Sequence, residues 1–178
     1  VNNNETTLTN DTIYDAANVL VTMSMDRENL GKVEDITRNS FEVFGYDQQD
    51  VVGSNVAILM PGFLRKRHQS FLVRYLTSRK TTLFNNQRRS FGKTKKGHIF
   101  PINIYVSVYP SLKNGLSYFG ILRPIKEFKQ YILLSNNGYV DSCTEDITSE
   151  LSINLNKSKV HISDLCLELG KVNAAFAF

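Results

Sequence analysis

One histidine of the chain stands where a small protein could hold a cofactor or a ligand. His68 falls in a stripe with apolar residues at the spacing of one face of an α-helix, namely Leu64, Phe71, Leu72, Tyr75 and Leu76. Charged and polar residues occupy the other faces, so we expect the imidazole of His68 to point inward. An inward histidine is either a ligand-binding group or a core residue hydrogen-bonded to backbone, and the spacing leaves both open.

The other residues that carry chemistry are not spaced for catalysis or for metal binding. His98 and His161 form no nucleophile, base and acid set with their neighbours, so we expect no enzymatic centre. Cys143 and Cys166 lie 23 residues apart without a CxxC motif, which predicts neither a disulfide framework nor a zinc site. The sequence therefore favours a non-catalytic protein of a reducing compartment.

A sheet opposite the His68 helix is predicted by strict alternation of residue type. Ile102, Ile104, Val106 and Val108 alternate with polar or aromatic residues, which is the period of a strand with one buried face. Strands are expected at 19–24, 33–36, 86–91, 98–109 and 117–123, short helices between 39 and 59, and a longer helix at 64–78. This order predicts an α+β fold: one antiparallel sheet of about five strands with the helices on one face.

Length and pattern divide the chain into three parts. The 178 residues, 42% of them apolar, suffice for one domain with its own core, which we place at 14–126. Residues 1–13 are polar and are expected to form a flexible or helical lead-in. From residue 127 the pattern of the first strands and helices recurs. We therefore expect 127–178 to be the start of a second, incomplete repeat, which must dock on the first domain or await further residues.

Charge is distributed unevenly along the chain. Residues 1–50 carry ten acidic against three basic side chains, 51–126 none against fourteen, and 127–178 seven against four, which gives −7, +14 and −3. The basic middle, chiefly 65–96, is either a surface for an anionic partner or offset by the acidic first third. No nucleic-acid-binding motif accompanies it. Because no apolar run approaches the roughly 20 residues of a spanning helix, the chain as given is expected to be soluble. The use of cysteine favours a reducing, intracellular compartment.

The order of short motifs over residues 14–126 resembles the PAS family of sensor and interaction domains. The motifs are Gly31-x-Val33, Phe44-Gly45-Tyr46, Val52-Gly53, Met60-Pro61, His68, Arg74-Tyr75, Lys96-Gly97-x-x-Phe100-Pro101 and Tyr118-Phe119-Gly120. The resemblance implies a PAS fold with a pocket between helices and sheet. It also implies non-catalytic signalling through other domains of a parent protein, through a PAS partner or through a homodimer.

One subfamily is similar in its organisation. The second repeat and the basic stretch 91–101 look like the PAS regions of the tiny macrocysts protein B family of protists, which are large multi-spanning proteins. This likeness implies a membrane-embedded parent protein that carries the module on the cytoplasmic side.

A second subfamily is similar in the central segment. From residue 68 to 101 the chain resembles the haem-binding PAS domain of the FixL oxygen sensors. The likeness implies that His68 ligates iron, that Arg74 meets a haem propionate and that Arg88 lies on the distal side. Ile104 and Val106 would then face the ring.

The same segment departs from the haem sensors in three residues. Asn85 and Gln87 stand where those sensors have small glycines, and Phe84 could fill the pocket together with Phe71 and Tyr75. The sequence therefore favours the absence of a cofactor rather than bound haem. It leaves three functions open: a sensory or protein-interaction module, a haem-binding gas or redox sensor, and a structural assembly domain with a filled core.

Overall fold

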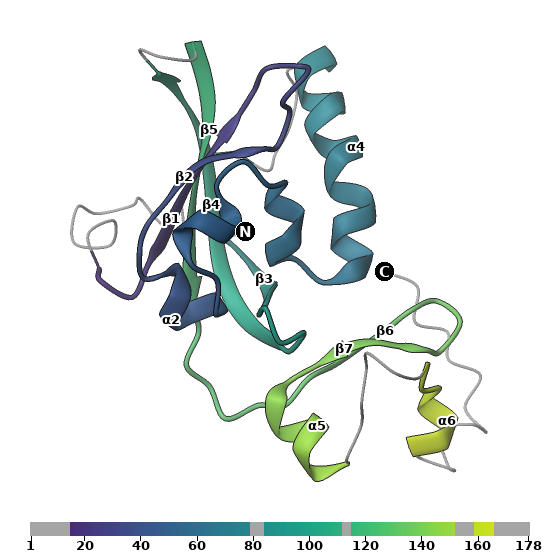
Figure 1. Ribbon diagram of the computed structural model, residues 1–178. Coiled ribbons are helices and arrows are strands. Elements are labelled where there is room, and N and C mark those ends of the chain that lie inside the picture. The colour runs from purple at the N-terminus through teal and green to yellow at the C-terminus, as the bar shows by residue number, and fades with distance from the viewer. Residues whose placement is uncertain (1–14, 79–83, 112–114, 152–158, 166–178) are drawn as a thin grey trace, which may run out of the picture.

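Five strands form one antiparallel sheet in the computed structural model, which describes residues 15–78, 84–111, 115–151 and 159–165 (Figure 1). The strand order is β2-β1-β5-β4-β3. The strands are β1 (Val19–Ser24), β2 (Val33–Ile36), β3 (Arg88–Lys93), β4 (Ile99–Ser111) and β5 (Gly115–Pro124). The predicted α+β fold with a five-stranded antiparallel sheet is confirmed. The lead-in expected at 1–13 lies outside the described residues.

The third strand begins later than its sequence pattern indicates. We expected it from residue 86, but pairing with β4 starts where Arg88 faces Ile104. Asn85 has a φ of 59°, in the left-handed region, and its N–H donates to the carbonyl oxygen of Val106 at 2.8 Å. A residue in this conformation cannot continue a regular strand, so the two residues after it lead into β3 instead of belonging to it.

The helices gather on one face of the sheet, as predicted (Figure 1). They are α2 (Ser40–Phe44), α3 (Gln48–Val51), the 3-10 helix η1 (Val56–Leu59) and α4 (Gly62–Ser78). The turn after α2 closes at Gly45, whose φ of 75° suits glycine and whose N–H donates to the carbonyl of Phe41. Helix α4, which carries His68, begins two residues earlier than the apolar stripe indicates.

The core lies between the sheet and these helices. Its largest fully buried side chains include Tyr118, Phe44 and Ile36. The rings of Phe44 and Phe100 meet with centroids 5.1 Å apart, beside Gly92 on β3. A Cβ at Gly92 would stand 2.9 Å from both rings, so only glycine permits this packing.

A smaller unit, the C-terminal segment, comprises the described residues from 127 to 165. It contains a two-stranded sheet of β6 (Ile132–Leu134) and β7 (Val140–Cys143), followed by α5 (Glu145–Glu150) and α6 (Ile162–Leu165). Figure 1 shows β6 and β7 beside the end of α4 at which that helix begins. Among the described residues, no helix is long and apolar enough to cross a membrane.

Candidate functional site

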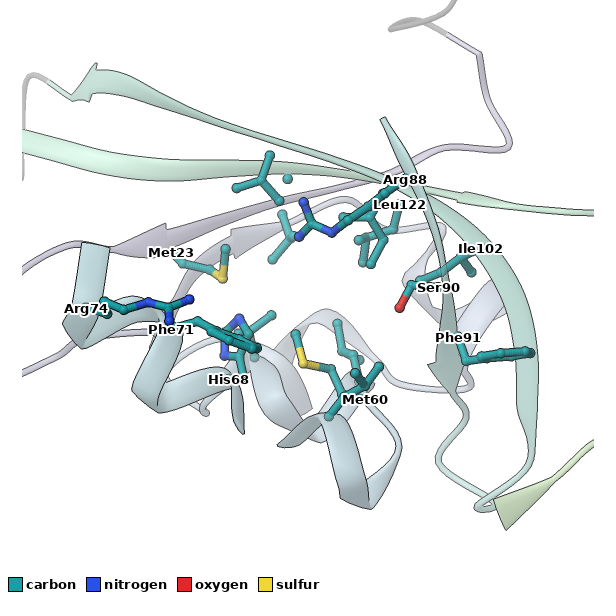
Figure 2. Close-up of a pocket in the computed structure, with 17 residues that line it drawn as sticks. Met23, Met60, His68, Phe71, Arg74, Arg88, Ser90, Phe91, Ile102 and Leu122 are labelled. Atoms are coloured by element: carbon teal, nitrogen blue, oxygen red, sulfur yellow. The ribbon is translucent and has the colours of Figure 1, made fainter. Parts of the chain in front are cut away.

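A cavity of about 840 Å³ separates the His68 helix from the sheet (Figure 2). This volume lies in the range of small-molecule sites, about 300–1,000 Å³. The sheet forms the floor and η1 with α4 forms the opposite wall, while the edge strand β3 closes one side. The lining residues are Val21, Met23, Ile102, Ile104, Val106, Gly120 and Leu122 from the floor; Val56, Leu59, Met60, Leu64, His68, Phe71 and Arg74 from the helical wall; and Arg88, Ser90 and Phe91 from β3.

His68 lines the cavity, and its ring lacks one of its expected partners. The Nδ1 atom is buried and has no hydrogen-bond partner among the described residues. Burial, together with the nearby charge of Arg88, lowers the pKa of His68 to about 4. The imidazole is therefore neutral at physiological pH. A neutral ring with an unsatisfied nitrogen at a cavity wall can bind a metal ion or a hydrogen-bonding ligand.

Two arginines border the same cavity from opposite walls. Arg88 projects from β3, where it is half-buried, and burial lowers its pKa from the usual value. Arg74 lies on α4, with its guanidinium carbon 5.4 Å from the centroid of the Phe71 ring. Figure 2 shows both side chains reaching toward the space above His68. The structure thus brings together His68, Arg74 and Arg88 as well as Ile104 and Val106, the five residues singled out for a haem site; whether they bind haem stays a prediction.

Two of the predicted pocket residues do not line the cavity. Tyr75 and Phe84 pack instead on Tyr118. The ring centroids are 4.3 Å apart for Tyr75 and Phe84, 5.9 Å for Tyr75 and Tyr118, and 5.6 Å for Phe84 and Tyr118. Tyr75 lies one helical turn after the cavity residue Phe71, at a level of α4 where it meets the buried Tyr118 ring on β5. Of the aromatic residues expected to fill the pocket, only Phe71 borders it, so the filled core predicted for an assembly domain is not what the structure has.

Tyr118 gives this aromatic cluster an unusual polar atom. Its side chain is fully buried, and its hydroxyl has no hydrogen-bond partner among the described residues. Burial, with the neighbouring Tyr75 hydroxyl, raises the pKa of Tyr118 to about 12. The hydroxyl therefore stays protonated at any physiological pH and is a donor without an acceptor.

Sequence reasoning missed several lining residues. Met23 follows Val19 and Val21 on the inward side of β1, so its position was available from the alternation. Gly120 pairs with Val21 and Val106 in the sheet, and its lack of a side chain leaves room above the floor. Ser90 and Phe91 gave no signal, because the sequence of β3 does not alternate between apolar and polar residues.

The C-terminal segment touches two walls of the cavity. Asp141 accepts a hydrogen bond from the backbone N–H of Gly62, the first residue of α4, at 3.0 Å. Tyr131 packs edge-on against the cavity residue Phe91, with ring centroids 5.0 Å apart. The Tyr131 hydroxyl donates to Glu127 at 2.6 Å, and Arg89 pairs with the same carboxylate. Both donors, the Tyr131 hydroxyl first, hold the pKa of Glu127 below its usual range.

The described part of the chain contains no cluster of side chains that could bind a metal ion. No group of three or more His, Cys, Asp or Glu residues there is placed to hold a metal ion. Cys143 is buried, which raises the pKa of its thiol, and Cys166 lies outside the described residues. Among the described residues, the cavity is therefore the candidate ligand-binding site.

Comparison with known proteins gives sequence likeness to two signalling proteins. No family model matches the chain. It is 34% identical over 89 residues, 49% of its length, to the sensor protein FixL of Bradyrhizobium diazoefficiens. It is 22% identical over 117 residues, 66% of its length, to a probable serine/threonine-protein kinase of Dictyostelium discoideum. These matches span only 17% and 8% of the two relatives.

Solved PAS domains are similar at low identity. One from Colwellia psychrerythraea is 18% identical with a TM-score of 0.47, covering 61% of this chain and 86% of that one. Another, from an HTR-like protein of Haloarcula marismortui, is 14% identical with a TM-score of 0.47, covering 65% and 87%. The strand order is β2-β1-β5-β4-β3, and α2, α3, η1 and α4, which lie between β2 and β3 in the chain, cover one face of the sheet. The chain therefore has a PAS-like α+β fold.

Proposed function

We propose that this chain is a non-catalytic sensory and protein-interaction module, in which occupancy of the cavity is transmitted through α4 to the C-terminal segment. The observation that carries the proposal is that one helix does both tasks. Helix α4 presents His68 and Arg74 to the cavity, and its first residue, Gly62, is held by Asp141 of the C-terminal segment. A ligand that moves this helix therefore changes the cavity wall and the contact between Gly62 and Asp141 together.

A second contact supports transmission along the same route. Phe91 lines the cavity on one side and packs on Tyr131 on the other. The Gly62 contact is tight as well, since a Cβ there would stand 2.4 Å from Oδ1 of Asp141. Both walls that a ligand touches are thus in direct contact with the C-terminal segment, and neither can shift without disturbing it.

The C-terminal segment is, in this proposal, the start of a second PAS-like repeat that follows the domain at 14–126. Hydrogen bonding supports the repeat. The N–H of Val56 donates to the carbonyl of Gly31 at 2.9 Å, and the N–H of Ile162 donates to that of Gly138 at 2.9 Å. Gly31 and Gly138 have φ of 80° and 78°. Isolated bridges follow the same plan, Lys32 with Asn55 and Tyr139 with His161.

The helix cap after each bridge is repeated too. The side chain of Asn55 accepts from the N–H of Ala57 at 2.9 Å, and Nδ1 of His161 accepts from the N–H of Ser163 at 3.2 Å. Nε2 of His161 then donates to the carbonyl of Asn137 at 3.0 Å. Two unrelated segments have no reason to share a glycine conformation, a bridge and a two-residue cap, so a common repeat is the simplest explanation.

The partners and setting of the module follow from these features as further parts of the proposal. We propose other domains of a parent protein as the direct partners, with a second copy of the chain or another PAS domain as possible dimerisation partners. The exposed basic side chains within 65–96 would contact an anionic surface. An intracellular location, with a parent protein of the membrane-embedded tiny macrocysts protein B type, accords with the organisation of the sequence.

A neutral dye tests whether the cavity is a binding site. Nile red, an uncharged apolar fluorophore, should bind the full chain, and Ile104→Trp should abolish binding because an indole would occupy the cavity. Tyr105→Trp is the matched control, since residue 105 faces the other side of the same strand. Equal binding by the two variants, or none by the wild-type protein, would refute a ligand-accepting cavity.

A second candidate function is a haem sensor, and the observation that favours it is the buried, partnerless Nδ1 of His68 at the cavity wall. The residues present fit the group: His68 would ligate the iron, Arg74 would pair with a propionate, Arg88 would lie on the distal side, and Ile104 with Val106 would contact the ring. Bound haem would supply reversible binding of a diatomic gas. The protein's part is to keep the imidazole neutral and water away from it.

Absorption spectroscopy separates this candidate from the first. Haemin added to the purified full chain should give a shifted Soret band that is lost in His68→Ala and kept in His98→Ala. His98 is the matched control because it lies outside the cavity, with its ring 3.3 Å from the Thr148 hydroxyl. A band that persists unchanged in His68→Ala would exclude His68 as the ligand.

A further inference from the structure

The walls of the cavity carry positive charge and no negative charge. Of the seventeen described residues that line it, Arg74 and Arg88 are cationic and none is Asp or Glu. His68 adds no charge at neutral pH, because its pKa is near 4. The surrounding sequence reinforces this, since residues 51–126 contain no acidic side chain at all. An anion that enters the cavity therefore meets an attractive potential in a low-dielectric space.

The rest of the lining suits a hydrocarbon chain. Apart from the charged groups, His68 and Ser90, every side chain that borders the cavity is apolar, and most are aliphatic. In Figure 2 the guanidinium group of Arg74 lies beside His68 at one side of the space and that of Arg88 at its upper edge, while Ser90 and Phe91 lie on the other side. A ligand with a charged head and an apolar tail matches a cavity with two guanidinium groups and an otherwise largely apolar lining.

Arg88 offers the head group a guanidinium at the cavity wall. Arg88 is half-buried on β3, and burial disfavours its charged form. A carboxylate beside a guanidinium forms two parallel charge-assisted hydrogen bonds, among the strongest polar contacts in proteins. Such a contact inside the cavity would stabilise a bound carboxylate.

On the basis of the proposed ligand-sensing function, we infer that the cavity binds an aliphatic carboxylate, with its carboxylate on Arg88 and Arg74 and its chain directed toward Phe91. Phe91 is also the residue that packs on Tyr131, so the tail of the ligand would end at the contact with the C-terminal segment. Chain length would then decide how strongly the ligand presses on that contact.

Three probes that differ in head group test this class on the full chain. Decanoate, decan-1-ol and decylammonium share one tail and carry negative, zero and positive charge. By isothermal titration at pH 7.5, decanoate should bind at least about tenfold more tightly than decan-1-ol, and decylammonium should bind more weakly than either. This comparison needs no variant and so does not depend on the folding of a mutant.

Substitutions of Arg88 then test whether this residue binds the carboxylate. Arg88→Met should weaken decanoate binding by about tenfold or more while leaving decan-1-ol binding within about twofold, which also reports that the cavity is intact. Arg88→Lys should retain part of the affinity, because it keeps the charge without the bidentate geometry. Arg67→Met is the matched control, because it removes the same charge from an exposed residue of α4 that does not line the cavity.

The outcomes distinguish this inference from the function on which it rests. Equal affinity for decanoate and decan-1-ol, or an Arg88→Met protein that binds decanoate as tightly as the wild type, would overturn the carboxylate class and leave a ligand-sensing cavity standing. Binding of none of the three probes, together with no Nile red binding, would overturn the ligand-sensing function itself.

Discussion

The carboxylate of Asp141 accepts a hydrogen bond from the backbone N–H of Gly62, 79 residues earlier in the chain, at 3.0 Å. Gly62 begins the helix that forms one wall of the cavity, and its N–H has no partner within the helix. Asp141 therefore caps α4 from outside, and its negative charge lies at the positive end of the helix dipole. The cavity and the C-terminal segment share this one contact at a helix end.

Removing the cap should loosen the start of α4. Asp141→Ala is expected to cost about 1 kcal/mol of stability, the usual effect of losing a helix cap, and to speed amide hydrogen exchange in the first turn of α4. The stability of Asp141→Asn should lie between those of the wild-type protein and Asp141→Ala, because asparagine keeps the hydrogen-bond acceptor and loses the charge. Asp146→Ala, an exposed acidic residue in α5, is the control and should leave α4 unchanged.

Gly62→Ala should reproduce the loss of the cap although alanine favours helices. Its Cβ would stand 2.4 Å from Oδ1 of Asp141 and would displace the carboxylate. In the double variant with Asp141→Ala that clash is absent, so the two effects should not add. Fully additive losses of stability would show that Gly62 and Asp141 do not act through one contact.

Tyr118→Phe should stabilise the protein by about 1 kcal/mol. The change removes a buried hydroxyl that lacks a partner and keeps the ring stacked on Phe84. Tyr131→Phe is the matched comparison of opposite sign, because its hydroxyl donates to Glu127. Urea denaturation measures both, and a destabilised Tyr118→Phe protein would mean that the hydroxyl has a bonding partner.

The pKa of Tyr118 adds a readout at alkaline pH. An ordinary tyrosine ionises near pH 10, whereas Tyr118 in the folded state ionises near 12. The unfolded chain therefore releases a proton that the folded chain retains, and stability falls as pH rises through this window. Tyr118→Phe should flatten that part of the stability profile.

His68 should make the protein less stable on mild acidification. Its folded pKa is about 4 and that of an unfolded histidine about 6.5, so between these values only the unfolded chain is protonated. Stability should fall as pH drops, by up to roughly 2 kcal/mol between pH 7.5 and 5. The comparison is with His68→Leu, which removes this titration; identical pH profiles of the two proteins would refute a buried neutral imidazole.

The fold was largely predictable because its signals are local. Alternation from Ile102 to Val108 and the apolar stripe beside His68 each fix a buried face, and two such faces must cover one another. The grouping of His68 with Arg74 and Arg88 followed from the resemblance to a known family, because the residues themselves place only His68 inward.

What the sequence did not predict depends on long-range packing. Tyr75 belongs to the stripe of α4, yet it packs on Tyr118 and not on the cavity, and Phe84 does the same. The partner of Gly62 could not be found either, since nothing in the local sequence links a helix start to a carboxylate 79 residues away. Register and docking are set by the whole chain.

Amide hydrogen exchange of β6 and β7 tests most directly whether the cavity communicates with the C-terminal segment. The wild-type chain and its Ile104→Trp variant, with an indole in the cavity, would be compared with Tyr105→Trp, which changes the other face of the same strand. We predict altered exchange in the first turn of α4 and in residues 132–143 for Ile104→Trp alone. Exchange in 132–143 that is identical in all three proteins would contradict transmission from the cavity through α4.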